Sequence, residues 1–356
     1  MTYYYKSKNH ASKPSYGAIN SLKDFKIIIF TTLFLLFSAF FCFMFNLFTY
    51  AEKPASINNQ TKKVITINSG QAFKSFSEKL HKDGIIKDLS KFNLFARIKG
   101  YDKKVKAGEY ILSPSMTPHK ILQILAAGKV YLHKITIPEG YNIRRIASII
   151  ARAGLCTETE FIGSATNSSF VHNERIDAET FEGYLFPDTY YFSKDITPEK
   201  IISAMVKRFR SVFTSTYKEQ AKKLGFSIHK AVTLASIIEK ETGDPKERSV
   251  ISSVFHNRLK KKIRLESDPT VIYGIKDFDG NIKKIHLETP TPYNTYMIHG
   301  LPAGPIANPG IKAIEAALYP ADTDFLYFVS KKDNTHMFST NIRDHNKAVR
   351  KYQLRR

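Results

Sequence analysis

Two residue types are nearly missing from this chain: it has two cysteines and no tryptophan in 356 residues. Cys42 lies inside a long apolar run and Cys156 lies far beyond it, so we expect no disulfide between them. No histidine accompanies Cys156 in the sequence, so a core position is a better interpretation than a nucleophile. Zinc-finger spacing, a P-loop and a Gly-rich dinucleotide motif are also missing, which removes three common classes of site.

Acidic residues are scarce relative to basic ones: 32 Asp and Glu face 54 Lys and Arg, for a net charge of +22. An excess of this size attracts nucleic acid, anionic membranes or anionic polymers. Because no nucleic-acid module is present to use the charge, we do not expect a nucleic-acid partner. No histidine pair has metal-ligand spacing and no Gly-x-Ser-x-Gly elbow occurs, so neither a metal, a cofactor nor a serine nucleophile is predicted.

Residues 27–48 form a run of 22 residues without a charge. As a helix this run measures about 33 Å, which is enough to span a bilayer. A signal peptide has an apolar region of only about 7–15 residues and a small-residue cleavage site, and neither fits here. We therefore predict an uncleaved transmembrane helix. Five lysines against one aspartate precede it, so residues 1–26 are expected to be a cytoplasmic tail, with the remainder outside the inner membrane.

The chain beyond the predicted transmembrane helix divides into four parts in this interpretation. Residues 49–63 have linker composition, and residues 64–130 show the pattern strand, helix, helix, strand, helix, with the last helix predicted from Pro118 to Ala127 before Gly128. That layout, with the Ala107-Gly-Glu-Tyr-Ile-Leu112 segment, resembles a small sugar-binding LysM module. Residues 131–178 are predicted to be a connecting α/β segment, with a strand and a helix from Ile143 to Ala153.

Residues 179–356 have the size of a catalytic domain and are predicted to be mainly helical. One helix is expected to begin at Asp244 as N-cap, with Glu247 as its capping-box partner, and to end near Lys261. Strands at 325–329 and 336–339 are predicted to form a short hairpin. The expected fold class is therefore α+β: a transmembrane helix, a small LysM-like module and a mainly α catalytic domain.

Glu239 is the residue on which the functional interpretation depends. A helical wheel puts Thr233, Ser236 and Lys240 on one polar stripe, whereas Glu239 lies on the apolar side, between Val232 and Ala235. A carboxylate in that position loses hydration, which raises its pKa and suits it to donate a proton near neutral pH. Glu239 is accordingly the predicted catalytic residue.

Four polar stretches accompany Glu239, and together they combine carboxylates and amides with tyrosines. Such a mixture suits sugars, whose hydroxyl groups need polar partners and whose ring faces stack on aromatic rings. The predicted substrate-binding residues are Asp188, Tyr190, Asn257, Asp268, Thr270, Tyr273, Glu288, Asn294 and Tyr296. The proline-rich loop at 300–310 is interpreted as a rigid wall of a groove, because its prolines remove the donors that a phosphate cradle needs.

A close carboxylate pair on the Glu239 helix is not expected. Glu241 lies about 200° around the helix from Glu239, so the two side chains cannot face one substrate together. This argues against a retaining dyad built from this helix, in which the carboxyl groups are about 5 Å apart. An inverting partner at Asp188, Asp268 or Glu288 stays open.

In combination, these segments resemble the endolytic murein transglycosylase (YceG-like) family. The resemblance is carried, in order, by LASIIEKET at 234–242, SVFHNRL at 253–259, SDPTVIYG at 267–274, LETPTPYNTY at 287–296 and GLPAGPIANPG at 300–310. It implies a single-pass inner-membrane enzyme that cuts peptidoglycan strands internally, between N-acetylmuramic acid and N-acetylglucosamine, and leaves 1,6-anhydro ends. Glu239 matches the family's catalytic glutamate, acting first as acid and then as base.

The resemblance also implies partners: glycan strands as substrate and peptidoglycan synthases beside which nascent strands are terminated. Two other functions stay open at this point. One is a membrane-tethered scaffold that binds peptidoglycan without cutting it, and the other is an inverting, muramidase-type hydrolase.

Overall fold

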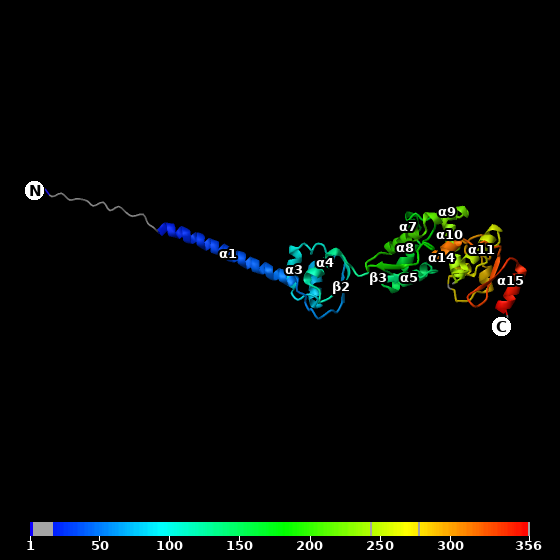
Figure 1. The fold of residues 1–356 in the computed structure, drawn as a ribbon, viewed down its shortest axis with the longest axis horizontal. Helices are drawn as coiled ribbons and strands as arrows, with labels where there is room; N and C mark the ends of the chain where they lie inside the picture. Colours follow the sequence, from blue (N-terminus) through cyan, green and yellow to red (C-terminus); the bar gives the residue numbers. More distant parts are fainter. Residues whose placement is uncertain (3–16, 243, 277, 355–356) are drawn as a thin grey trace. The chain divides into compact units, whose positions relative to one another are not determined.

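The computed structural model describes residues 1–2, 17–242, 244–276 and 278–354, and it separates two compact units, Met1–Tyr131 and Leu132–Arg356 (Figure 1). The fold mixes helices with short strands, in agreement with the α+β expectation. Its six strands within the described residues form three antiparallel pairs, one in the first unit and two in the second. Most of the expected cytoplasmic tail, residues 3–16, lies outside the described residues.

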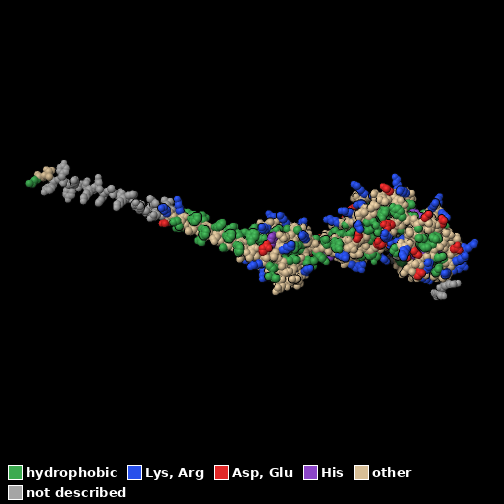
Figure 2. Space-filling model, in the orientation of Figure 1, with side chains coloured by type: hydrophobic (Ala, Val, Ile, Leu, Met, Phe, Trp, Pro, Cys, Tyr) green, Lys and Arg blue, Asp and Glu red, His purple; other side chains and the backbone are tan. Residues whose placement is uncertain are grey.

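Helix α1 (Gly17–Ala51) begins the first unit and contains the predicted membrane segment. From Lys23 to Ala51 it is long and apolar enough to cross a membrane by length and composition. Figure 2 shows hydrophobic side chains along this helix. The helix extends three residues past the predicted end at residue 48, and its last turns pack into the first unit, where Leu47 and Ala51 are buried. The anchor is therefore continuous with a folded core rather than joined to it by a free hinge.

The rest of the first unit follows the predicted element order. Its elements are β1 (Lys63–Ile67), α2 (Phe73–Lys82), α3 (Leu89–Ile98), β2 (Gly108–Leu112) and α4 (Pro118–Ala127). Strands β1 and β2 pair antiparallel with Ile65 opposite Tyr110. Helix α4 has the bounds that the sequence predicts, because Pro118 follows the Thr117 cap and Gly128 ends the helix at a φ of 65°.

The second unit is mainly helical. Its elements are β3 (His133–Thr136), α5 (Ile143–Arg152), α6 (Glu158–Ala165), α7 (Ser168–Asn173), β4 (Thr189–Phe192), α8 (Pro198–Val212), α9 (Ser215–Lys223), α10 (Ile228–Glu241), α11 (Arg248–Lys260), α12 (Asp268–Gly274), α13 (Lys284–Glu288), α14 (Ile311–Leu318), β5 (Tyr327–Ser330), β6 (His336–Ser339), α15 (Ile342–Val349) and a π-helical turn at Arg350–Leu354. Hairpin β5–β6 forms as predicted, with Phe328 opposite Phe338.

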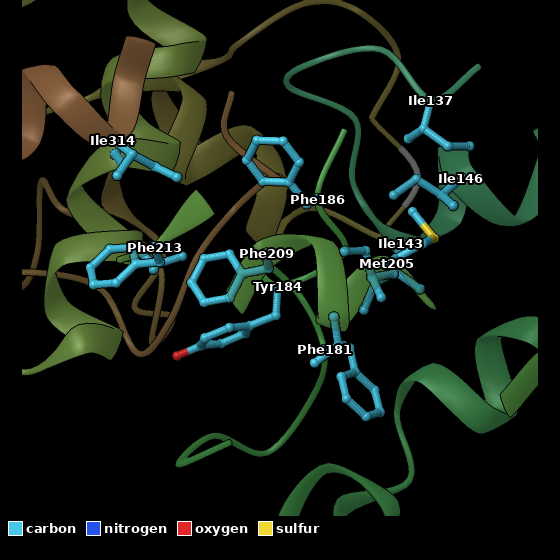
Figure 3. Close-up of a cluster of buried hydrophobic side chains, with 14 of the residues drawn as sticks. Ile137, Ile143, Ile146, Phe181, Tyr184, Phe186, Met205, Phe209, Phe213 and Ile314 are labelled. Carbon is cyan, nitrogen blue, oxygen red and sulfur yellow. The ribbon is translucent and has the colours of Figure 1, made fainter. Parts of the chain in front are cut away.

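Residues 131–178, which the sequence separates from 179–356, share a sheet and a core with them. Strand β3 pairs antiparallel with β4, so Ile135 lies opposite Tyr190. One continuous core then joins α5 to the later helices. Figure 3 shows part of it, with side chains from α5, α8 and α14 in one cluster. The strand partners lie more than fifty residues apart, and no local sequence signal reports such a pairing.

The predicted start of the helix after Glu239 is wrong. Helix α11 begins at Arg248, four residues after Asp244, and its N-cap residue Glu247 makes no capping hydrogen bond. The Asp244 carboxylate instead accepts from the Lys246 N–H at 2.9 Å, in a local turn. Glu247 is held by the hairpin, because its carboxylate contacts His336 Nδ1 at 2.6 Å. A tertiary contact thus replaces the local capping box.

Candidate active site

Helix α10 places Glu239 at the centre of the second unit. All eight residues from Ala231 to Ile238 are buried, so the helix is enclosed on every side. Thr233 and Ser236, the predicted polar stripe, are buried too. The Ser236 hydroxyl accepts from the Ile306 N–H at 3.0 Å and thereby ties the 300–310 loop to the helix. The helix therefore fixes the position of Glu239 rigidly.

The Glu239 carboxylate is nearly enclosed, with 6% of its side chain exposed. Oε2 accepts from the Gly310 N–H at 3.0 Å, and Oε1 lies 3.3 Å from Arg248 Nη2. Gly310 is the N-cap of α14, so the carboxylate also faces a helix N-terminus. Two donors from different elements hold the side chain in one orientation.

The pKa of Glu239 is raised, as its apolar helix predicts. Burial is the largest cause and removes hydration from the charged form. The Gly310 N–H and the Arg248 charge act in the opposite direction, and the nearby Glu139 carboxylate raises the pKa further. The balance favours the protonated form at a higher pH than for an ordinary glutamate, which suits a general acid.

Glu139 is the second carboxylate of this site, and sequence reasoning missed it. A Cβ placed on Gly310 would lie 2.0 Å from Glu139 Oε1, so the carboxylate occupies the space beside that glycine. Glu239 contacts the N–H of the same glycine. Since a Cβ lies roughly 2.5 Å from its own nitrogen, at most about 7.5 Å separates the two carboxylates. Glu139 belongs to the 131–178 segment, where no sequence signal pointed to the site.

The turn at Gly140 completes the surroundings of Glu239. Gly140 has a φ of 72°, and a Cβ there would lie 3.4 Å from Glu239 Cγ, so glycine suits both the turn and the close approach. Lys240 Nζ lies 3.5 Å from the Gly140 carbonyl oxygen. Burial, followed by the charge of Arg145, lowers the pKa of Lys240. Basic groups therefore line one side of the site.

Asn308 and Glu182 form a buried support beneath this turn. Asn308 Nδ2 donates to the Tyr141 carbonyl and to Glu182 Oε1, both at 2.9 Å. Glu182 also accepts from the Ile143 N–H at the start of α5, at 3.2 Å, and from the Tyr273 hydroxyl, at 3.1 Å. Burial raises the pKa of Glu182 to about 7. The network links the Gly140 turn, α5 and α12 in one unit.

The 300–310 loop, which the sequence predicts to be a groove wall, lies against α10. Gly183 has a φ of 87°, and a Cβ there would lie 2.6 Å from Pro305 and 2.7 Å from Val232. Only glycine fits a backbone that is squeezed between loop and helix in this conformation. The loop therefore reaches Gly310 on a fixed path.

Several predicted substrate residues meet one another around α12. The Tyr296 hydroxyl donates to Asp268 Oδ1 at 2.7 Å, and the Thr270 hydroxyl lies 2.8 Å from that of Thr295. Tyr273 reaches Glu182, and Asn294 donates to three carbonyl oxygens of residues 286, 287 and 289. These contacts order the loops beside the site.

The other predicted substrate residues lie apart from this group. Asp188 pairs with Arg208 at 2.6 Å, and the Tyr190 hydroxyl donates to the Phe186 carbonyl oxygen. Asn257 Nδ2 donates to the Thr323 and Phe325 carbonyl oxygens. Glu288 is exposed and pairs with Lys284 at 3.4 Å.

Glu241 faces different partners from Glu239, as the helical wheel indicates. Its carboxylate accepts from the Ser267 hydroxyl, and burial raises its pKa to about 7.

The described residues include no group of three or more His, Cys, Asp or Glu side chains that could hold a metal ion. A buried carboxyl group with a raised pKa and two donors, as at Glu239, can give up and take back a proton.

Comparison with known proteins gives a consistent result. The model of the YceG-like family matches residues 65–351. An endolytic murein transglycosylase of Bacillus subtilis (strain 168) is 36% identical over 316 residues, covering 84% of this chain and 87% of the relative. One of Streptococcus pneumoniae serotype 2 is 28% identical over 334 residues, covering 83% of this chain and 59% of the relative. A crystal structure of a putative YceG-like protein from Listeria monocytogenes has a TM-score of 0.57 at 34% identity, covering 80% of this chain and 98% of that one.

Proposed function

This chain belongs to the YceG-like family, and from that premise we propose that Glu239 is the single acid and base of an endolytic peptidoglycan transglycosylase. The chain is an enzyme of the peptidoglycan lytic transglycosylase class, as its relatives' names indicate. This disfavours the passive scaffold that the sequence left open.

The reaction needs one proton carrier. Protonated Glu239 gives its proton to the oxygen between N-acetylmuramic acid and N-acetylglucosamine, and the bond from that oxygen to the muramyl anomeric carbon breaks. The Glu239 carboxylate then removes the proton of the muramyl 6-hydroxyl, whose oxygen bonds to the anomeric carbon. The product carries a 1,6-anhydro ring, water is not consumed, and Glu239 ends protonated as it began.

The enclosure of Glu239 is the observation that carries this proposal. Burial favours the acid form needed at the start, and the Gly310 N–H and Arg248 stabilise the carboxylate formed after the first proton transfer. A group that acts as acid and then as base needs support for both protonation states, and these contacts provide it.

Product masses test the proposal directly. Full-length protein in detergent is incubated with purified peptidoglycan strands, and the new ends are weighed by mass spectrometry. Anhydro ends, lighter by one water than reducing ends, are expected within the strand rather than only at its termini. Reducing ends alone would remove the transglycosylase mechanism.

Glu139 is the carboxylate that one alternative, the inverting hydrolase, would use. Inverting enzymes hold their two carboxyl groups about 6.5–9.5 Å apart, and the upper limit of about 7.5 Å for Glu139 and Glu239 overlaps that range. In this case Glu139 would activate a water, and digestion in ¹⁸O-water would place the label in the new reducing ends. Unlabelled anhydro ends would exclude this route.

We also propose the placement of the enzyme. Helix α1 spans the inner membrane once, and the lysines before it keep the N-terminus in the cytoplasm, so Glu239 faces the wall. The LysM-like module at residues 64–130 then holds the glycan, and peptidoglycan synthases supply nascent strands. Protease added outside spheroplasts should degrade residues 132–356 while an N-terminal tag survives; loss of the tag would reverse the orientation.

A further inference from the structure

A cavity of about 620 Å³ lies in the second unit, between the start of α5 and the end of α12. Its volume falls within the range of sites that take a drug-sized ligand. Its charged and aromatic lining includes Arg144, Arg145, Glu182, Tyr273 and Lys276. Neither the reaction at Glu239 nor the predicted substrate residues account for its basic side chains.

The basic groups of this cavity are available for a ligand. Arg144, Arg145 and Lys276 are exposed, and none forms an ion pair with a carboxylate of the described residues. The Arg145 guanidinium lies 5.4 Å from the centre of the Tyr141 ring, which orients it without neutralising it. Arginines left in this state bind carboxylates well, because the guanidinium matches both oxygens.

Glu182 does not oppose an anion here. Its oxygens are occupied by the Ile143 N–H, Asn308 Nδ2 and the Tyr273 hydroxyl. Burial also raises its pKa to about 7, so a large share of the group is neutral near that pH. The net charge of the cavity is therefore positive.

The cavity lies near the Gly140 turn, because its lining begins at Asn142 and Arg145 lies over the ring of Tyr141, the residue after Gly140. Arg145 is close enough to Lys240 for its charge to lower the Lys240 pKa, after burial. Lys240 Nζ lies 3.5 Å from the Gly140 carbonyl oxygen, and Gly140 packs against Glu239. The Gly140 turn thus connects Arg145 to the surroundings of Glu239.

We propose that this cavity, called here the α5 basic pocket (Arg144, Arg145 and Tyr273), binds the carboxylates of the peptide stem carried by the muramyl residue next to the cut. The inference rests on the proposed function, since the stem hangs from the lactyl group of that same sugar and must lie near Glu239. Binding of the stem carboxylates by the α5 basic pocket makes the enzyme selective for strands that carry peptide stems.

The test compares two substrates with one full-length enzyme in detergent: strands that carry peptide stems and the same strands after the stems are removed by an amidase. Wild-type protein is expected to cut stem-bearing strands with a kcat/KM about tenfold higher, mainly through KM. The double variant Arg144→Gln/Arg145→Gln should lose that preference, and the single variant Arg144→Gln, which keeps Arg145 beside Lys240, should lose part of it while cutting bare strands at the wild-type rate.

Arg152→Gln is the matched control, because Arg152 lies on the same helix and bonds back to the Ser148 carbonyl oxygen outside the pocket. It should keep the preference. A double variant that retains the preference, or that loses activity equally on both substrates, overturns the proposal. If its binding to anionic phospholipid vesicles falls while the stem preference stays, the pocket serves a lipid headgroup and the proposal also fails. Absence of cleavage of either substrate by wild type would instead refute the proposed function.

Discussion

Replacement of Glu139 by glutamine tests how the two carboxylates of the site act on each other. The Glu139 charge raises the pKa of Glu239, in addition to burial, and the two groups are at most about 7.5 Å apart by their shared contact with Gly310. At that distance two like charges repel by about 0.6 kcal/mol even in a water-like dielectric. Glu139→Gln removes this repulsion, so Glu239 loses its proton at a lower pH.

The expected result is a change in the pH profile rather than in the maximal rate. On the alkaline limb kcat/KM should fall about threefold or more, whereas the acidic plateau should stay as in wild type. Because Glu139 is exposed, high salt should reduce the difference. The assay is release of new strand ends from pH 5 to 9.

Gly310→Ala tests the same coupling by displacing the Glu139 carboxylate instead of removing its charge. The new Cβ would lie 2.0 Å from Glu139 Oε1, so that side chain must move by more than about 1 Å, while the N–H that holds Glu239 is retained. The φ of −76° accepts alanine, and loss of a glycine N-cap costs less than about 1 kcal/mol. The alkaline limb of kcat/KM should therefore move to lower pH, by less than in Glu139→Gln. Gly163→Ala, whose Cβ meets no atom within 4 Å, is the control.

Superimposable pH profiles for Glu139→Gln and wild type would refute the electrostatic coupling. If Glu139→Gln instead lowers kcat/KM by more than about a hundredfold at every pH, the effect is not electrostatic coupling. That result would make Glu139 the general base of an inverting hydrolase.

Three further changes have defined outcomes. Arg248→Met removes the positive charge that lowers the pKa of Glu239, so the alkaline limb of kcat/KM should move to higher pH; an unchanged limb would contradict the 3.3 Å pairing. Asn308→Ala removes one donor from Glu182 and one from the Tyr141 carbonyl oxygen, leaves the buried Leu185 N–H without its acceptor, and should lower the free energy of unfolding by about 2–4 kcal/mol in urea titrations; a change within about 0.5 kcal/mol would contradict the buried network. Glu182 has its pKa raised from 4.5 to about 7 in the folded state, so its stabilising contribution is present below about pH 4.5 and is lost as the pH rises through about 7. The free energy of unfolding should thus fall between pH 5 and 8, by on the order of 3 kcal/mol from this group, and Glu182→Gln should flatten that dependence.

Elements with complete local signals were predictable from the sequence. Helix α4 has a capping threonine, a proline at its first position and a glycine at its end, and its bounds agree with the prediction. The signals for the apolar helix at 27–48 and for the hairpin β5–β6 likewise lie within a few neighbouring residues. Helix α11 shows the limit of such signals, because Asp244 and Glu247 have the pattern of a capping box but make other contacts.

The residues of the site also differ in how far local sequence predicts them. Glu239 is recognisable because the residues next to it on one helix are apolar. Glu139 and Asn308 are not recognisable, since each acts through partners more than 90 residues away. The carboxylates, amides and tyrosines predicted to bind sugar are equally suited to order loops, and Asn294 with its three carbonyl contacts shows why residue type alone does not separate the two roles.

The central claim, that Glu239 alone carries the proton, is tested most directly by the Glu239→Gln variant of the full-length protein. Glutamine keeps the shape of the side chain and can still accept from the Gly310 N–H, so folding should be preserved and thermal unfolding provides that check. The rate at which anhydro ends form, measured by mass spectrometry, is expected to fall at least about a thousandfold. If the variant forms them at the wild-type rate, Glu239 does not carry the proton.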